Sequence, residues 1–134
     1  MFEVLDMGAS GLLAQRTRLD TIAANIANAT TTRDPSGAPG PYRRRFVMFA
    51  PGQPNDHAKP GVRVESVGLD QTPGQKRYEP GHRDADANGY VEYPNVDLSV
   101  EYVNALEASR AYEANISMME VSKAMINATL RLIA

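Results

Sequence analysis

Proline and glycine are confined almost entirely to the middle of this 134-residue chain. All nine prolines lie between Pro35 and Pro94, and eight of the ten glycines lie between Gly37 and Gly89. Proline breaks helices and glycine weakens them. The distribution therefore predicts an α+β chain with long helices at both ends and a Pro/Gly-rich β-hairpin insert between them. We expect an N-terminal helical segment over residues 1–30, the β-rich insert over 31–94 and a C-terminal helix over 95–134.

The first segment carries apolar residues at alternating steps of three and four, which is the spacing of a helical seam. These residues are Phe2, Leu5, Ala9, Leu12, Leu19, Ala23 and Ile26, with Arg16 as a polar interruption. We expect the helix to end near residues 28–30, where Asn28 gives way to β-branched threonines. Gly8 and Gly11 either allow close approach of a neighbouring helix or merely weaken the first turns.

The last segment carries two such rows side by side. The first row is Tyr102, Ala105, Ser109, Tyr112, Ile116, Met119, Lys123, Ile126, Leu130 and Ile133. The second is Val100, Val103, Ala114, Met118, Val121, Met125, Ala128 and Leu132. With Asn95 as the expected N-cap, the helix would be roughly 55 Å long. A helix of this length with so wide an apolar face cannot be covered by the shorter N-terminal helix, so we expect other subunits to cover part of it.

The middle of the chain reads as short strands separated by turns. The expected strands are Arg45–Phe49, Val62–Val67, Gln75–Glu79 and Gly89–Tyr93, of which Val62–Val67 alternates most strictly. Residues 52–61 and 80–88 are expected to be loops.

The charge and residue usage exclude several classes of function. The formal net charge is −2, so we expect no general attraction to nucleic acid. The start Met1–Asp6 is acidic and lacks the pattern of a cleaved signal peptide, and no run of about 18 apolar residues predicts insertion in a membrane. Tyr42–Phe46 mixes arginines with aromatic groups, which favours the start of an exposed strand or a local contact with an acidic neighbour over nucleic-acid binding.

Neither a metal site nor a catalytic centre is expected. Asp84–Gly89 matches the first half of an EF-hand calcium loop, but position 12, where a bidentate carboxylate belongs, is Asn95. A polar loop that closes with an Asn-Gly turn is favoured. His57 and His82 lie in loops without a spaced second ligand and are expected to be solvated, and motifs for nucleophilic catalysis or phosphate binding are lacking. We therefore expect no enzyme and no cofactor.

Four sequence motifs, taken in order, resemble those of the bacterial flagellar rod and hook proteins, and of their proximal-rod branch in particular. They are Leu19–Thr31, Thr31–Arg33 with Gly40–Arg44, Pro80–Val96, and Ala108–Asn115 with Lys123–Met125.

This resemblance implies a structural subunit that is exported without signal cleavage and polymerises into the hollow rod crossing the periplasm. The terminal helices would form a coiled-coil-like layer around the export channel of a torque-transmitting drive shaft, with the insert outside. The implied partners are other rod proteins, the rod–export-gate junction protein and copies of the chain itself. The candidate assembly residues are Leu5, Leu12, Leu19, Ile22, Asn25, Ile26 and Asn28 in the first helix, and Tyr102, Arg110, Tyr112, Asn115, Ile116, Met119, Ile126 and Leu130 in the last. A small monomeric secreted calcium-binding or adaptor module is the alternative.

Overall fold

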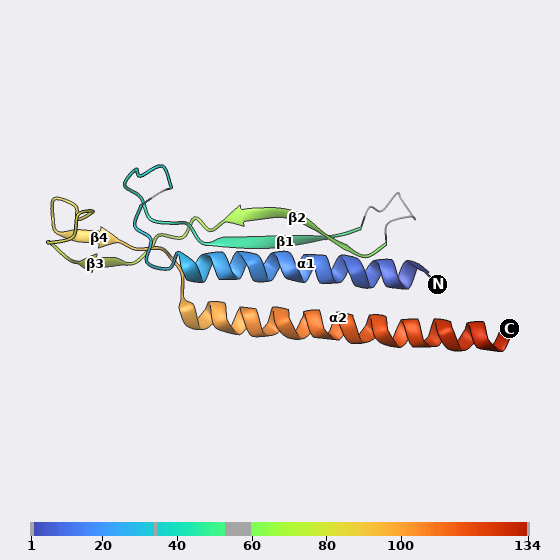
Figure 1. The fold of residues 1–134 in the computed structure, drawn as a ribbon. Coiled ribbons are helices and arrows are strands. Elements are labelled where there is room, and N and C mark those ends of the chain that lie inside the picture. Colours follow the sequence, from blue (N-terminus) through green and yellow to red (C-terminus); the bar gives the residue numbers. More distant parts are fainter. Residues whose placement is uncertain (1, 34, 53–59, 134) are drawn as a thin grey trace.

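The computed structural model describes residues 2–33, 35–52 and 60–133. The chain forms a helix at each end, with two antiparallel hairpins between them, in an α+β arrangement (Figure 1). The elements are α1 (Phe2–Ala27), β1 (Arg45–Pro51), β2 (Val62–Leu69), β3 (Lys76–Tyr78), β4 (Tyr90–Glu92) and α2 (Leu98–Ile133).

Helix α1 is the middle layer of the molecule. The β1–β2 hairpin runs along one side of α1, and α2 runs antiparallel along the other side (Figure 1). The β3–β4 hairpin lies at the opposite end from the chain termini. Because α2 has 36 residues against 26 in α1, it is about 54 Å long against about 39 Å. The C-terminal end of α2 therefore extends past the beginning of α1.

Local polar groups determine where the helices begin and end. Asp97, rather than the expected Asn95, caps α2: its Oδ1 accepts hydrogen bonds from the backbone N–H groups of Ser99 (2.8 Å) and Val100 (3.3 Å). The prediction of Asn95 was wrong because that side chain instead accepts a hydrogen bond from the backbone N–H of Arg44. Helix α1 ends where expected, at Ala27, before a turn at residues 28–30.

The two helices approach closely through small residues. A Cβ atom added to Gly8 would lie 2.5 Å from Met119 Cγ, and one added to Gly11 would lie 3.0 Å from Asn115 Nδ2. Ala108 is fully buried in α2. Of the two interpretations of the helical glycines, close approach of a neighbouring helix is confirmed.

The row of residues that forms this contact differs from the apolar row expected for α1. Large apolar residues were expected at the seam, but the most buried positions of α1 are Gly8, Gly11, Ala14, Ile22 and Asn25. At the contact with α2, Gly8 and Gly11 let the helix axes come together, whereas Asn25 also bonds to Arg45 of β1. The expected row is displaced to the flank, where Ala9, Arg16 and Ala23 are exposed.

Gly8→Ala is expected to lower the free energy of unfolding by about 1 kcal/mol. The gain in helix propensity, up to about 1 kcal/mol, is outweighed by overpacking against Met119, which costs about 1–3 kcal/mol. Urea denaturation of the single variants and of Gly8→Ala combined with Met119→Ala should give a coupling energy of about 0.5–2 kcal/mol. Strictly additive effects would show that the two side chains do not compete for this space.

All four expected strands are present, with bounds that differ by a few residues. Strands β1 and β2 pair from Arg45↔Leu69 to Pro51↔Val62, and the register shifts between Met48 and Phe49. Glu65 has no partner across this bulge, but the alternation expected for Val62–Val67 is kept: Val62 and Val64 are half-buried, whereas Arg63, Glu65 and Val67 are exposed. The hairpin is attached to α1 through Ser10, whose Oγ accepts a hydrogen bond from the backbone N–H of Val62 at 3.1 Å.

Among the described residues, neither helix is long and apolar enough to cross a membrane.

Candidate assembly surface

A row of exposed apolar side chains runs along α2 beside the residues that pack against α1, and we call it the outer stripe. It consists of Val100, Val103, Ala114, Met118, Val121, Met125, Ala128 and Leu132, all exposed. Val103 is 64% exposed and Val121 is 60% exposed. The sequence predicted this row by its spacing. A row of apolar residues along one helix face is typical of a surface that contacts another protein.

The end of α2 is uncovered for a different reason. Ile126, half-buried, lies with Val4 of α1 around a shallow apolar hollow. Leu130 and Ile133 continue the same row toward the C-terminus, yet they are 59% and 79% exposed. They are uncovered because α1 begins at Phe2 and does not extend this far.

The structure places the predicted assembly residues in three different environments. Tyr102, Arg110, Ile116 and Leu130 are exposed. Leu5, Leu12, Leu19, Ile26, Asn28, Tyr112, Asn115, Met119 and Ile126 are half-buried within the chain. Ile22 and Asn25 are buried. Contact of all these residues with other subunits stays a prediction, and the outer stripe, which the predicted set omitted, offers more open surface than most of them.

Asn25 belongs to a buried polar network that the sequence did not predict. Its Oδ1 accepts hydrogen bonds from the backbone N–H of Arg45 (2.9 Å) and from the Tyr42 hydroxyl (3.1 Å). Its Nδ2 donates to the backbone carbonyl of Arg45 (2.8 Å) and to Glu101 Oε2 (3.1 Å). The amide group therefore has a full set of partners, and it joins α1 to β1 and α2.

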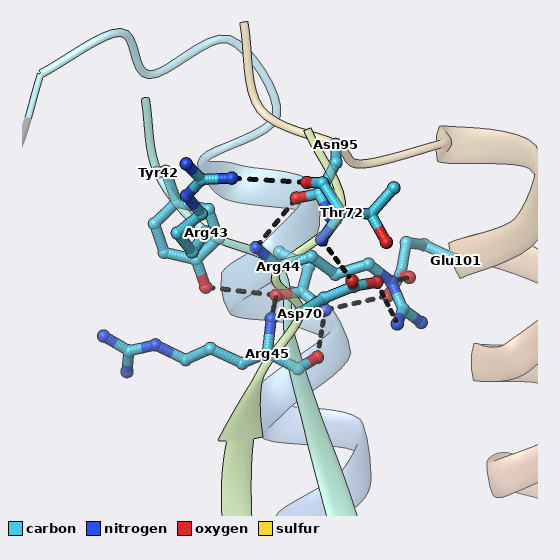
Figure 2. A network of polar contacts seen from close by, with 9 residues as sticks. Tyr42, Arg43, Arg44, Arg45, Asp70, Thr72, Asn95 and Glu101 are labelled. Carbon is cyan, nitrogen blue, oxygen red and sulfur yellow. Dashed lines mark hydrogen bonds and ion pairs between the residues drawn. The ribbon is translucent and has the colours of Figure 1, made fainter. Parts of the chain in front are cut away.

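Glu101 is fully buried at the start of α2, and Arg44 provides its charge partner. Arg44 Nε donates to Glu101 Oε1 at 2.6 Å, and the two side chains point toward one another (Figure 2). The Arg44 guanidinium also lies 3.9 Å from Asp70, which follows β2. We call Asn25, Arg44 and Glu101 the polar node. A buried charge needs such a partner, because an unpaired one costs several kcal/mol.

The expected start of an exposed strand within Tyr42–Phe46 is confirmed, because β1 begins at Arg45 and both Arg45 and Phe46 are exposed. Tyr42 is half-buried, and burial raises the pKa of its hydroxyl, an effect that nearby Arg45 reduces and Glu101 reinforces. The acidic groups that the segment contacts, Glu101 and Asp70, belong to its own chain. The hydrogen bond from Thr72 is the main cause that holds the pKa of Asp70 below its usual range.

A second polar cluster attaches the β3–β4 hairpin to the segment that follows α1. Asp84 Oδ2 accepts a hydrogen bond from the Thr32 hydroxyl at 2.8 Å, and Asp84 Oδ1 forms an ion pair with Arg33 at 2.5 Å. The residue that would start a calcium loop is therefore bound to a threonine and an arginine. His82 is half-buried rather than solvated, and its Nδ1 accepts the backbone N–H of Asp84. His57 lies outside the described residues, within which no cluster of three or more metal-ligating residues occurs.

Asp84 makes the stability of the chain depend on pH. The hydrogen bond from Arg33 is the main cause that lowers the pKa of Asp84 in the folded chain, and burial opposes it. A lowered folded-state pKa stabilises the fold above the unfolded value of about 3.9, and this stabilisation is lost as the pH falls through the folded value. Asp84→Asn should therefore be less stable than the parent at pH 7, and the difference should disappear once the pH falls below the folded-state pKa of Asp84. Urea denaturation of both proteins at a series of pH values would measure the difference in free energy of unfolding. A difference that stays constant as the pH falls would contradict the prediction.

Comparisons with known proteins point to the same family over nearly the whole chain. A family model described as flagella basal body rod protein matches residues 5–33, and one described as the C-terminal region of flagellar basal body rod FlgEFG proteins matches residues 87–132. A Salmonella typhimurium protein named flagellar basal-body rod protein FlgC is 45% identical and covers 98% of this chain and 97% of the relative.

Two further relatives from distant bacteria carry the same name. The Borreliella burgdorferi protein is 41% identical and covers 99% of this chain and 97% of the relative. The Bacillus subtilis protein is 35% identical and covers 98% of this chain and 97% of the relative. The resemblance inferred from the four sequence motifs is confirmed: the chain belongs to the FlgC family of flagellar basal-body rod proteins.

Proposed function

We propose that this chain is a structural subunit of the bacterial flagellar basal body that polymerises into the proximal rod. The observation that carries the proposal is the outer stripe of α2, an exposed apolar row in a chain of a rod-protein family. Apolar surface of this extent favours burial against other proteins at about 25 cal/mol per Å². A rod subunit supplies such partners as copies of itself and as other rod proteins.

We further propose that α1 and α2 form a coiled-coil-like layer that encloses the export channel, with the insert outside it. Helix α1 is covered on two sides by elements of its own chain, whereas α2 is covered on one. The outer stripe and the free end of α2 are therefore the surfaces that a neighbouring helix would cover. In this arrangement residues 1–30 and 95–134 make up the helical domain and residues 31–94 make up the insert.

The partners and location follow from this role. We propose contacts with other rod proteins, with the rod–export-gate junction protein and with copies of this chain, in the rod that spans the periplasm. The chain would reach the rod by export without signal cleavage and would transmit torque, with no catalytic step. The residues predicted for assembly in α1 and α2, from Leu5 to Leu130, remain candidates for these contacts, joined by the outer stripe.

Deletion of the gene in its own bacterium tests the role directly. The expected result is a non-motile strain whose purified basal bodies lack a rod, with both defects repaired by the wild-type gene. Antibodies against the chain should also label basal bodies of the parent strain. A deletion strain that swims and builds complete basal bodies would contradict the proposal and favour the alternative of a small monomeric secreted calcium-binding or adaptor module.

A further inference from the structure

The interface between α1 and α2 would accept more than one register. Its closest contacts involve Gly8 and Gly11, which have no side chain to interlock with the other helix, and the methyl group of Ala108. On the α2 side the residues that are less exposed recur at steps of three and four, so displacement by seven residues presents a similar face. After such a displacement Gly11 would meet Ser122 in place of Asn115.

The lengths of the helices also permit this displacement. Helix α2 has 36 residues and α1 has 26, a difference larger than one heptad of seven. Helix α1 would therefore remain in contact with α2 along nearly its whole length. The displacement would also bring Leu130, now 59% exposed, against the beginning of α1.

The displaced register would break the contacts that Glu101 makes within the polar node. Asn25 would face the methyl group of Ala108 instead of the carboxylate of Glu101, with which it now makes a 3.1 Å hydrogen bond. Glu101 would also move away from Arg44, to which it is joined at 2.6 Å. Both Asn25 and Glu101 are fully buried in the observed register, so these bonds are not replaced by water there.

Other polar contacts near the two helices contribute less to the choice of register. Arg18 and Glu107 form a 3.2 Å ion pair between the helices, but the Glu107 side chain is 66% exposed. Exposed pairs of this kind contribute little. Arg33 and Asp84 hold the β3–β4 hairpin and do not bridge α1 and α2.

We propose that Asn25, Arg44 and Glu101 are register-determining residues, which hold α2 in one of two registers that the rest of the interface accepts. Buried polar groups that fix register at some cost in stability are well attested between helices. The register determines how far α2 projects past the beginning of α1, by about 10 Å per heptad. The relevance of that length to rod assembly rests on the proposed function, whereas the register itself does not.

Engineered cysteines read the register directly, because the chain contains no cysteine of its own. Gly11→Cys with Asn115→Cys reports the observed register, and Gly11→Cys with Ser122→Cys reports the displaced one. Each pair is placed in the otherwise native chain and in an apolar-node chain that carries Asn25→Leu, Arg44→Met and Glu101→Met. The purified full-length proteins are oxidised with glutathione disulfide, and disulfide formation is followed by gel shift while circular dichroism reports helix content.

With the native node, the displaced pair should close at least about tenfold more slowly than the observed pair. With the apolar node, helix content should be retained and the two rates should agree within about threefold. Arg18→Met with Glu107→Met is the matched control, which removes an ion pair between the same helices and should leave the native ratio of rates unchanged.

Two results would overturn the proposal. The first is an apolar-node chain in which the displaced pair stays slow. The second is an apolar-node chain that loses its helices, since the node would then be a requirement for folding and not a selector of register. Because the rates are measured on the purified chain, neither result bears on the rod function, and failure of the rod function would not change them.

Discussion

Arg44→Met is expected to lower the free energy of unfolding by about 3 kcal/mol or more. The substitution keeps the bulk of an unbranched side chain but leaves the carboxylate of Glu101, which is fully buried, with only the Asn25 amide as a partner. Removal of one member of a buried ion pair is costly because the other charge stays away from water. Urea denaturation followed by circular dichroism would measure the loss.

Arg18→Met is the control, because it removes an ion pair between the same two helices whose acidic partner, Glu107, is mostly exposed. It should change the free energy of unfolding by less than about 1 kcal/mol. Combining Arg44→Met with Glu101→Met should restore part of the stability, since no charge is then left buried without a partner. Equal and small effects of Arg44→Met and Arg18→Met would contradict this account of the buried pair.

Val121→Asp is expected to abolish swimming while leaving the isolated subunit folded. Val121 is 60% exposed in the outer stripe, so the purified variant should match the parent in free energy of unfolding within about 0.5 kcal/mol. If a neighbouring helix covers this position in the rod, the carboxylate would be buried without a partner at every subunit, at a cost of several kcal/mol each. Swimming on soft agar and electron microscopy of basal bodies would measure the effect.

Asn127→Asp adds the same carboxylate to an exposed position of α2 outside the stripe. This control strain should swim nearly as the parent does. Normal swimming of the Val121→Asp strain at normal protein level would show that the outer stripe is not an assembly surface.

The sequence predicted the helices and strands because their signals are local. Absence of proline and glycine after Pro94, together with apolar residues at helical spacing, was sufficient to predict the long C-terminal helix. The exact boundaries depended on competition between similar groups. Asn95 and Asp97 are both good caps, and only the hydrogen bond from Arg44 to Asn95 shows why the chain uses Asp97.

The pairing of distant residues could not be predicted from the same signals. Asn25 and Glu101 are 76 residues apart, and nothing in either segment indicates that one binds the other. Periodicity identified apolar rows on both helices, but the choice of row for the contact depends on how closely the axes approach. Gly8 and Gly11 permit that approach, and their role becomes clear only when Met119 and Asn115 are seen opposite them.

The position of Asn25 beside Arg45 also has a consequence for how the hairpin meets other chains. Strand β1 has β2 on one side, and its other edge presents backbone groups that an additional strand could pair with. At the first residue of β1, the Asn25 amide already occupies both the N–H and the carbonyl of Arg45, as a neighbouring strand would. A strand from another chain therefore cannot begin to pair with this edge at Arg45. In a subunit whose helices present apolar surface, this blocked end of β1 favours association through the helices over pairing of strands.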